Sequence, residues 1–223
     1  MAGSLMDIIL KGANPGHGTH CAGNVAAVGN NSKGISGVAP SAKIMALRFI
    51  GNEGGTTADA VLAIRYAVDN GAKVLSNSWG SEGEDPNDSA TNLALKEAIK
   101  YAQDHDVLFI AAAGNGHQGK GYDNDSDPKP GVPASYDNDN IISVAAIDSA
   151  DALGTFSNWG ARTVDIAAPG VKVFSTVVQT EKYADGIGFM GMNIAGWDGT
   201  SMATPHVAGA AALYWSAHPT KTW

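Results

Sequence analysis

The chain lacks the cysteines, the positive charge and the long apolar runs on which several classes of protein depend. Cys21 is the one cysteine in 223 residues, so no disulfide can form within the chain and a disulfide-stabilised scaffold is excluded. Lysine and arginine number 14 against 22 aspartates and glutamates, and the net charge of −8 argues against nucleic acid and anionic membranes as partners. No apolar run approaches the ~18 residues of a membrane-spanning helix. Residues 1–6 also lack the basic start and apolar stretch of a signal peptide.

Charged residues are scarce as well, at 16% against about 25% in an average globular chain, whereas hydrophobic residues make up 44%. This balance excludes a disordered protein and predicts a packed core. Glycine is abundant instead, with 28 copies and no collagen-like period, which favours a loop-rich α/β enzyme scaffold. Because no boundary or repeat is visible, we expect residues 1–223 to form a single domain.

Apolar extended runs alternate with helical periods along the chain. The spacing predicts helices over residues 17–28, 58–70 and 92–104, and strands over residues 44–49, 74–78, 107–112 and 141–147. Strands that are apolar on both faces and separated by helices predict an α/β fold of three layers. In this fold a doubly wound, mostly parallel sheet carries helices on both faces. Residues 114–139 are expected to form a long surface loop.

Three motifs bring together the residue types of nucleophilic catalysis. Ser201 follows Gly-Thr at the predicted start of a helix, where free backbone N–H groups and the helix dipole can stabilise an oxyanion. Alone, this motif would be read as a simple N-cap. However, His17 also opens a predicted helix and can serve as the base that a serine hydroxyl requires. Asn115 ends an Ala-Ala-Ala-Gly-Asn run and offers a carboxamide donor to a developing oxyanion.

In this order the three motifs resemble those of the subtilisin-like serine peptidases, and the likeness covers nearly the whole chain. It also includes residues 34–40, 77–80 and 168–170. The resemblance implies a subtilisin-like fold and a serine endopeptidase that acts on polypeptides through an acyl-enzyme intermediate. It assigns Ser201 as nucleophile, His17 as general base and Asn115 as oxyanion donor. It further implies work outside the cell, although no signal peptide is visible.

The resemblance also assigns residues to substrate binding. Ser78, Trp79 and Gly80 match the family's substrate-binding edge, which pairs with an extended peptide by strand addition. A second set matches the wall of the pocket for the residue before the scissile bond, and its small side chains imply a roomy apolar pocket. This set consists of Ala111, Ala112, Ala113 and Gly114.

One departure from the family pattern limits the expected activity. The family carries a catalytic Asp in an Asp-Ser-Gly or Asp-Thr-Gly turn before the histidine, and neither tripeptide occurs here. Asp7 lacks this turn and lies too near His17, so we do not assign the role to it. Loss of this carboxylate lowers kcat on the order of 10⁴-fold in other serine peptidases, including a subtilisin. The family pattern therefore predicts a chain that is incomplete at both ends and impaired in activity.

Two alternatives to an active subtilisin-like peptidase are open. The first follows from the missing Asp and is a non-catalytic peptide-binding pseudoprotease or inactive fragment that keeps the cleft. A lipase-like esterase is disfavoured, because no Gly-x-Ser-x-Gly elbow surrounds Ser201. The absent first strand also leads us to expect an exposed sheet edge through which the chain can self-associate.

Weaker signals concern metals and the thiol. Asp123, Asp125 and Asp127 place three carboxylates alternately on a loop, which suits structural calcium, with a solvated acidic loop as an equal alternative. His17 and His20 could share zinc in principle, but no third ligand is apparent. For Cys21 we favour a small buried hydrophobe over a reactive thiol.

Overall fold

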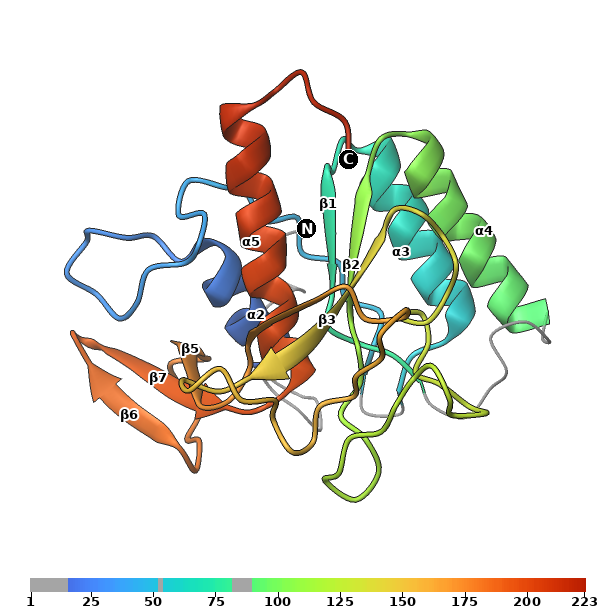
Figure 1. Cartoon of the computed structure of the whole chain (residues 1–223). Helices are drawn as coiled ribbons and strands as arrows, with labels where there is room; N and C mark the ends of the chain where they lie inside the picture. The colour runs from blue at the N-terminus through green and yellow to red at the C-terminus, as the bar shows by residue number, and fades with distance from the viewer. Residues whose placement is uncertain (1–15, 52–53, 82–89) are drawn as a thin grey trace.

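A parallel four-stranded sheet lies at the centre of the computed structural model, which describes residues 16–51, 54–81 and 90–223 (Figure 1). All neighbouring strands run parallel, in the order β1-β2-β3-β4. These strands are β1 (Val74–Asn77), β2 (Leu108–Ala112), β3 (Ile141–Ile147) and β4 (Ile166–Pro169). The α/β fold predicted from the alternating pattern is thereby confirmed.

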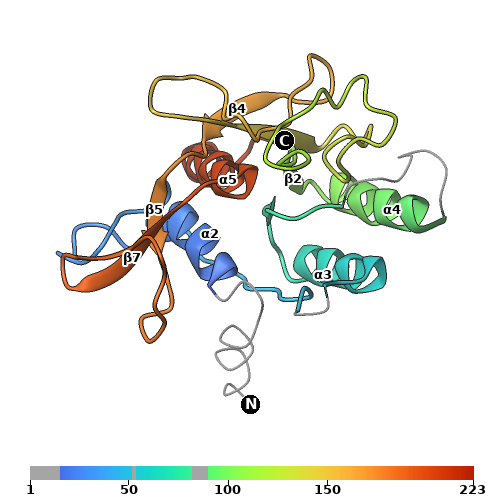
Figure 2. The same cartoon turned by 90° about the horizontal axis from the view of Figure 1, so that it is seen from below.

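Helices cover both faces of this sheet, as Figure 2 shows from below. On one face lie α3 (Thr57–Asp69) and α4 (Ala90–Asp104), and on the other lie α2 (His17–Ala26) and α5 (Thr200–Ala217). The alternation of side chains along β2 supplies both cores. Phe109 packs with the α3 and α4 side, whereas Ile110 packs with the α5 side, and both are fully buried.

A second, antiparallel sheet stands beside α2 and has the order β5-β7-β6 (Figure 1). Its strands are β5 (Val173–Thr176), β6 (Gly186–Phe189) and β7 (Met192–Trp197). Hydrogen bonds fasten it to α2: the hydroxyl of Ser175 donates to the carbonyl of His20 at 2.7 Å, and His20 Nε2 lies 3.0 Å from the carbonyl of Ala195. The sequence pattern did not predict this sheet, which borders the site described below.

Two local predictions need correction. Residues 44–49 form no strand and are largely exposed, because no described strand pairs with them to bury their apolar side chains. Residues 114–139 contain no helix or strand of their own, as expected, but 130–134 are buried rather than at the surface. Val132 and Ala134 of this part join the core on the α3 and α4 side, and Val132 forms an isolated bridge with Ser81. In the described part of the chain, no helix has the length and apolar character needed to cross a membrane.

Candidate active site

The N-terminus of α5 presents one free backbone donor beside a hydroxyl. A helix begins with four N–H groups that have no partner within the helix. Here the N–H of Thr200 donates to Asn115 Oδ1 at 2.8 Å, and those of Met202 and Ala203 donate to the carbonyl of Gly199 at 3.0 and 3.4 Å. Among the described residues the N–H of Ser201 has no acceptor, so it is available beside its own Oγ.

Asn115 is clamped in one orientation by Thr200. Both the backbone N–H and the Oγ1 hydroxyl of Thr200 lie within hydrogen-bond distance of Asn115 Oδ1, at 2.8 and 2.9 Å. Because a backbone N–H can only donate, the atom facing it must be the amide oxygen. The Nδ2 amine is thereby turned away, and it has no acceptor among the described residues. Asn115 and Ser201 thus each keep one unpaired N–H donor, as an oxyanion site requires.

The cleft around these groups also contains His17 and has a volume of about 580 Å³. In the structure the Ser201 hydroxyl donates to the carbonyl of Ser78 at 3.2 Å rather than to His17. Such catalytic contacts are often long or misaligned before substrate binds. Burial lowers the pKa of His17 from 6.5, which keeps the imidazole neutral at pH 7 and able to accept a proton.

The second ring nitrogen of His17 faces a thiol. Cys21 Sγ lies 3.9 Å from His17 Nδ1, and the thiol donates to the carbonyl of Ser201 at 3.4 Å. Burial raises the pKa of Cys21 to about 11, so the half-buried thiol is uncharged at neutral pH, and its role as a small apolar residue stays a prediction. No carboxylate of the described residues forms a hydrogen bond or ion pair with His17, and Asp7 lies outside them.

The predicted substrate edge is only partly brought to the cleft. Ser78 lies beside Ser201, with its hydroxyl donating to the Ser201 carbonyl at 2.9 Å. The Trp79 ring instead packs edge-on against Phe49 and Phe109, with centroid distances of 5.1 and 6.5 Å, next to the core. Gly80 is exposed and lies close to the carbonyl of Val132. Trp79 therefore packs next to the core and does not line the cleft at Ser201.

The predicted pocket wall lies behind the cleft at the end of β2. Ala111 and Ala113 are fully buried, Ala112 and Gly114 are partly buried, and none of the four lines the cleft at Ser201. Gly114 adopts a φ of +115°, and an added Cβ would lie 2.5 Å from Nδ2 of Asn158. Only glycine fits this turn, which redirects the chain from β2 so that Asn115 reaches α5.

The three loop aspartates do not converge on one point. Asp125 accepts from the backbone and hydroxyl of Thr163 at 3.0 and 2.7 Å, and these contacts, led by the hydroxyl, hold its pKa below 3.8. Asp123 accepts from the N–H of Asp125, and Asp127 accepts from the N–H of Lys129. Within the described ranges no three His, Cys, Asp or Glu side chains stand close enough to hold a metal ion. These carboxylates accept hydrogen bonds that hold the loop, and the calcium site expected from their spacing stays a prediction.

Two contributors to the site escaped the sequence analysis. Thr200 was considered there only as a helix cap, whereas its hydroxyl orients Asn115. His20 is fully buried and its ring stacks on Trp197 at 4.4 Å and 10°, and Trp197 lines the cleft. The Gly-Thr-Ser motif contained the first signal, but no local pattern announces the second, since residues 20 and 197 lie far apart in the sequence.

Comparison with known proteins places the chain among the subtilases. The model of the subtilase family, peptidase S8, matches residues 6–223. The chain is 43% identical to thermitase from Thermoactinomyces vulgaris over 199 residues, which are 89% of this chain and 60% of that protein. It is 39% identical to subtilisin DY from Bacillus licheniformis, over 92% of this chain and 65% of that protein. The chain thus spans about three fifths of the length of these two relatives.

Solved structures show the same likeness. A protease from Pseudoalteromonas arctica superimposes with a TM-score of 0.74 and 33% identity, over 92% of this chain and 60% of that one. A variant of the protease domain of PatA superimposes with the same TM-score and 27% identity, over 93% of this chain and 67% of that one.

Proposed function

The chain belongs to the subtilase family, and we propose that it is a serine endopeptidase that hydrolyses peptide bonds through an acyl-enzyme intermediate. In this proposal Ser201 is the nucleophile, His17 the general base and acid, and Asn115 the side-chain oxyanion donor. Polypeptides are its substrates. The observation that carries the proposal is the pair of unpaired donors, the Ser201 N–H and Asn115 Nδ2, in one cleft with His17.

The reaction begins when the Ser201 hydroxyl leaves the carbonyl of Ser78 and turns to His17. The neutral imidazole takes the hydroxyl proton while Oγ forms a bond to the scissile carbonyl carbon. The carbonyl oxygen becomes an oxyanion, which accepts hydrogen bonds from the Ser201 N–H and Asn115 Nδ2. His17 then gives the proton to the leaving nitrogen as the C–N bond breaks, which leaves Ser201 acylated. A water molecule, deprotonated by His17, attacks the acyl carbon, and the bond to Oγ breaks as His17 returns the proton to Ser201 and the acid is released.

The groups around His17 determine the turnover rate in this proposal. The imidazolium formed during the reaction faces the uncharged thiol of Cys21, with no carboxylate from the described residues beside it. A neutral thiol stabilises a cation far less than a carboxylate does. We therefore propose that the residues described support slow turnover, on the order of 10⁴-fold below that of a complete triad.

A second candidate is a peptide-binding pseudoprotease that keeps the cleft without turnover. The hydrogen bond from the Ser201 hydroxyl to Ser78, in place of one to His17, favours it. The two candidates share a fold and a cleft and differ in whether His17 activates Ser201.

Reaction of the purified chain with a fluorophosphonate probe distinguishes these candidates. We expect the probe to attach to Ser201, as located by mass spectrometry, and Ser201→Ala to prevent attachment. Thr204→Val is a matched control, since Thr204 lies on the same helix but donates to the Thr200 carbonyl, away from the cleft. Absence of labelling in a chain that circular dichroism shows to be folded would favour the pseudoprotease.

Three accompanying expectations stay predictions. Structural calcium is checked by melting the chain with CaCl₂ and with EDTA, where a higher melting temperature with CaCl₂ supports it and equal temperatures argue against it. Work outside the cell, suggested by the family resemblance, is checked by immunoblotting culture medium against cell extract. Self-association is checked by light scattering: β1 pairs with β2 alone among the described residues, and an unpaired strand edge favours a dimer at high concentration.

A further inference from the structure

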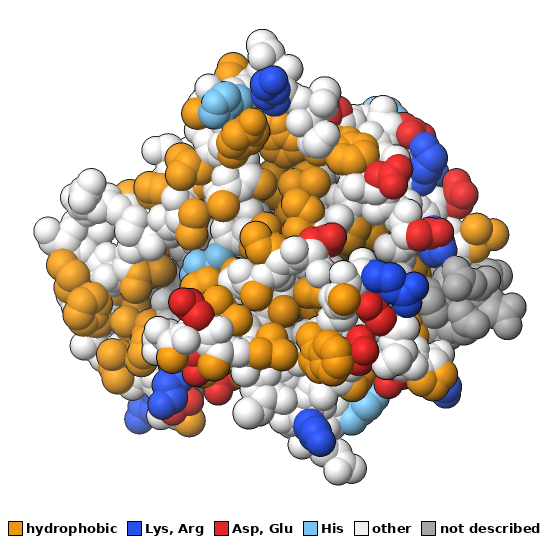
Figure 3. Space-filling model, viewed as in Figure 1, with side chains coloured by type: hydrophobic (Ala, Val, Ile, Leu, Met, Phe, Trp, Pro, Cys, Tyr) orange, Lys and Arg blue, Asp and Glu red, His pale blue; other side chains and the backbone are white. Residues whose placement is uncertain are grey.

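The cleft extends beyond Ser201 to side chains that the proposed mechanism does not use. Phe174 of β5, Gly196 of β7 and Asp185, which precedes β6, line it together with Ser201. The sheet that carries them presents apolar side chains to solvent, on the left of Figure 3. Phe174 is 44% exposed although it borders a cleft with charged residues. A large exposed ring at such a place suits contact with a ligand.

The strand register sets these three residues in one row. Phe174 lies opposite Gly196, and Gly186 lies opposite Ala195, so Asp185 falls beside Gly196 on the other flank. Directly opposite residues share a face of the sheet. An added Cβ at Gly196 would lie 3.0 Å from the Phe174 ring, which shows that the ring lies across the glycine. The row thus forms a groove with a flat aromatic surface and a carboxylate at its far side, hereafter the Gly196 groove.

Two carboxylates line the cleft here, and they differ in their partners. Asp198 accepts a hydrogen bond from the backbone N–H of Lys172 at 2.6 Å, which engages one of its two oxygens and links distant segments of the chain. Asp185 is exposed and forms no hydrogen bond or ion pair with the described residues. Lys172 is the cation among the cleft residues, and no ion pair joins it to Asp185. The net charge of −8 adds a field that attracts cations.

We propose that the Gly196 groove binds an arginine side chain of the substrate on the leaving-group side of the scissile bond. A guanidinium is planar and always charged, so it can stack on the Phe174 ring while it pairs with the Asp185 carboxylate. Lysine offers a point charge without the flat surface, and a neutral side chain satisfies one of the two groups.

The side of the scissile bond follows from which residues line the cleft. The substrate edge (residues 78–80) and the pocket wall (residues 111–114) belong to the acyl side, and none of them lines this part of the cleft. The Gly196 groove therefore receives the chain after the bond. This assignment rests on the proposed function, whereas the preference for arginine rests on the groove alone.

Peptide binding to the Ser201→Ala chain tests the preference without requiring turnover. Fluorescein-labelled alanine octapeptides carry one arginine, or its neutral isostere citrulline, at each position in turn. We expect about tenfold tighter binding of arginine at one position, measured by fluorescence anisotropy and reduced by added salt. Asp185→Asn and Phe174→Ala should each remove most of this preference.

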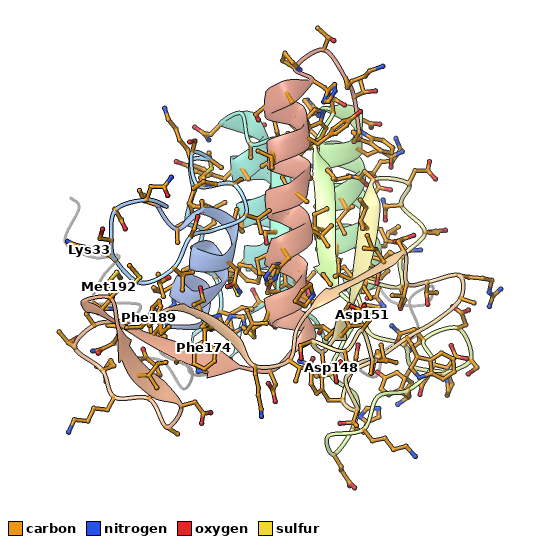
Figure 4. All side chains as sticks on the ribbon, turned by 60° about the vertical axis from the view of Figure 1, so that its left-hand side comes forward. Lys33, Asp148, Asp151, Phe174, Phe189 and Met192 are labelled. Carbon is orange, nitrogen blue, oxygen red and sulfur yellow. The ribbon has the colours of Figure 1, made fainter. Side chains whose placement is uncertain are left out.

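Matched controls separate the groove from general effects on charge and apolar surface. Asp151→Asn removes an exposed carboxylate outside the cleft, and its φ of +59° suits asparagine. Phe189→Ala removes a ring 46% exposed on the same sheet, opposite Met192 and outside the cleft (Figure 4). Both variants should keep the preference. Equal binding of arginine and citrulline at every position, or a preference that survives Asp185→Asn, overturns the proposal.

Cleavage of the same peptides by the chain with intact Ser201 fixes the register. We expect mass spectrometry of the products to place the preferred arginine after the cleaved bond, whereas a position before it overturns the leaving-group assignment. If the probe does not label Ser201 and no peptide is cut, while the arginine preference persists, the peptidase proposal fails and the arginine groove stands. If Ser201 is labelled but the preference is absent, the groove proposal fails and the peptidase proposal stands.

Discussion

The two sides of Ser201 differ in how firmly their side chains are held. On the side of Asn115, hereafter the fixed side, the carboxamide oxygen accepts hydrogen bonds from the backbone N–H and the hydroxyl of Thr200, and Thr200 itself is fully buried. On the side of the Gly196 groove, hereafter the open side, Phe174 is 44% exposed and Asp185 has no partner among the described residues. Groups aimed at a reacting carbonyl gain from being fixed in advance, whereas groups that select side chains can remain open. We therefore expect substitutions on the fixed side to change kcat and those on the open side to change preference.

The largest effect is expected at Asn115. Asn115→Ala should lower kcat by about 10²–10³-fold with KM little changed, because the lost donor acts on the oxyanion and not on the bound substrate. Hydrolysis of a p-nitrophenyl ester, whose good leaving group suits a weak enzyme, provides the measurement. Asn193→Ala is the control, since Asn193 lies on β7 and pairs with Gln179 outside the cleft. A raised KM with unchanged kcat would instead show that Asn115 contributes to substrate binding, as expected of the open side.

The next effect concerns pH. Burial lowers the pKa of His17 from 6.5, so the rate of Ser201 labelling should rise with pH and reach half its maximum below pH 6.5. Below that pKa the rate should fall about tenfold per pH unit, since a protonated imidazole cannot accept the serine proton. A midpoint above 6.5 would mean that a negative charge outside the described residues stabilises the imidazolium.

Folding must be monitored over the same pH range. A histidine whose pKa is lower in the folded state binds a proton more readily when unfolded. The contribution of His17 to stability is therefore full above pH 6.5 and declines as the pH falls below it. Circular dichroism at each pH shows whether lost labelling reflects chemistry or unfolding.

A smaller effect is expected at Thr200. Thr200→Val keeps the backbone N–H bond to Asn115 but removes the hydroxyl donor, so the amide is held by one contact instead of two. One such bond contributes about 1 kcal/mol, so kcat should fall about fivefold. The decisive readout is a double-mutant cycle: added to Asn115→Ala, the substitution should cost nothing further in kcat. Additive losses would show that Thr200 acts on the reaction without Asn115.

Sequence reasoning located the fixed side better than the open side, for a physical reason. Ser201, His17 and Asn115 each belong to a short motif at the end of a strand or the start of a helix, where local order implies a role. The parallel sheet was predictable because its strands are continuous apolar runs, such as residues 107–112. Residues 44–49 have the same pattern without a described partner strand, and there the prediction was wrong.

The Gly196 groove could not be predicted in this way. It depends on two strand registers. Both β5 and β7 are held by contacts with α2, and the turn of the hairpin sets the register between β6 and β7. In β6 glycine alternates with Ile187 and Phe189, but the strand has only 4 residues and all are exposed, so the alternation marks no buried face. The regular spacing of the loop aspartates suggested calcium, and that call stays a prediction, whereas the hydrogen bonds that these carboxylates accept from the loop backbone and from Thr163 could not be read from the spacing.

The smallest effect is expected in the loop of Asn124 and Asp125, which supports the fixed side from outside the cleft. Asn124 donates to the carbonyl of Ala113 at 2.9 Å, and its neighbour Asp125 ties the same loop to Thr163. Asp125→Asn should lower Tm by roughly 2–4 °C and leave kcat unchanged within about twofold, because it loosens the loop but not Asn115. Asp127→Asn, which affects a single bond to Lys129, is the control.

Since the pKa of Asp125 lies below 3.8 in the folded chain, the contribution of Asp125 to stability is full above about pH 4 and declines as the pH falls further. Asp125→Asn should therefore flatten the acid side of a Tm profile, and a large fall in kcat would show that the fixed side extends to this loop.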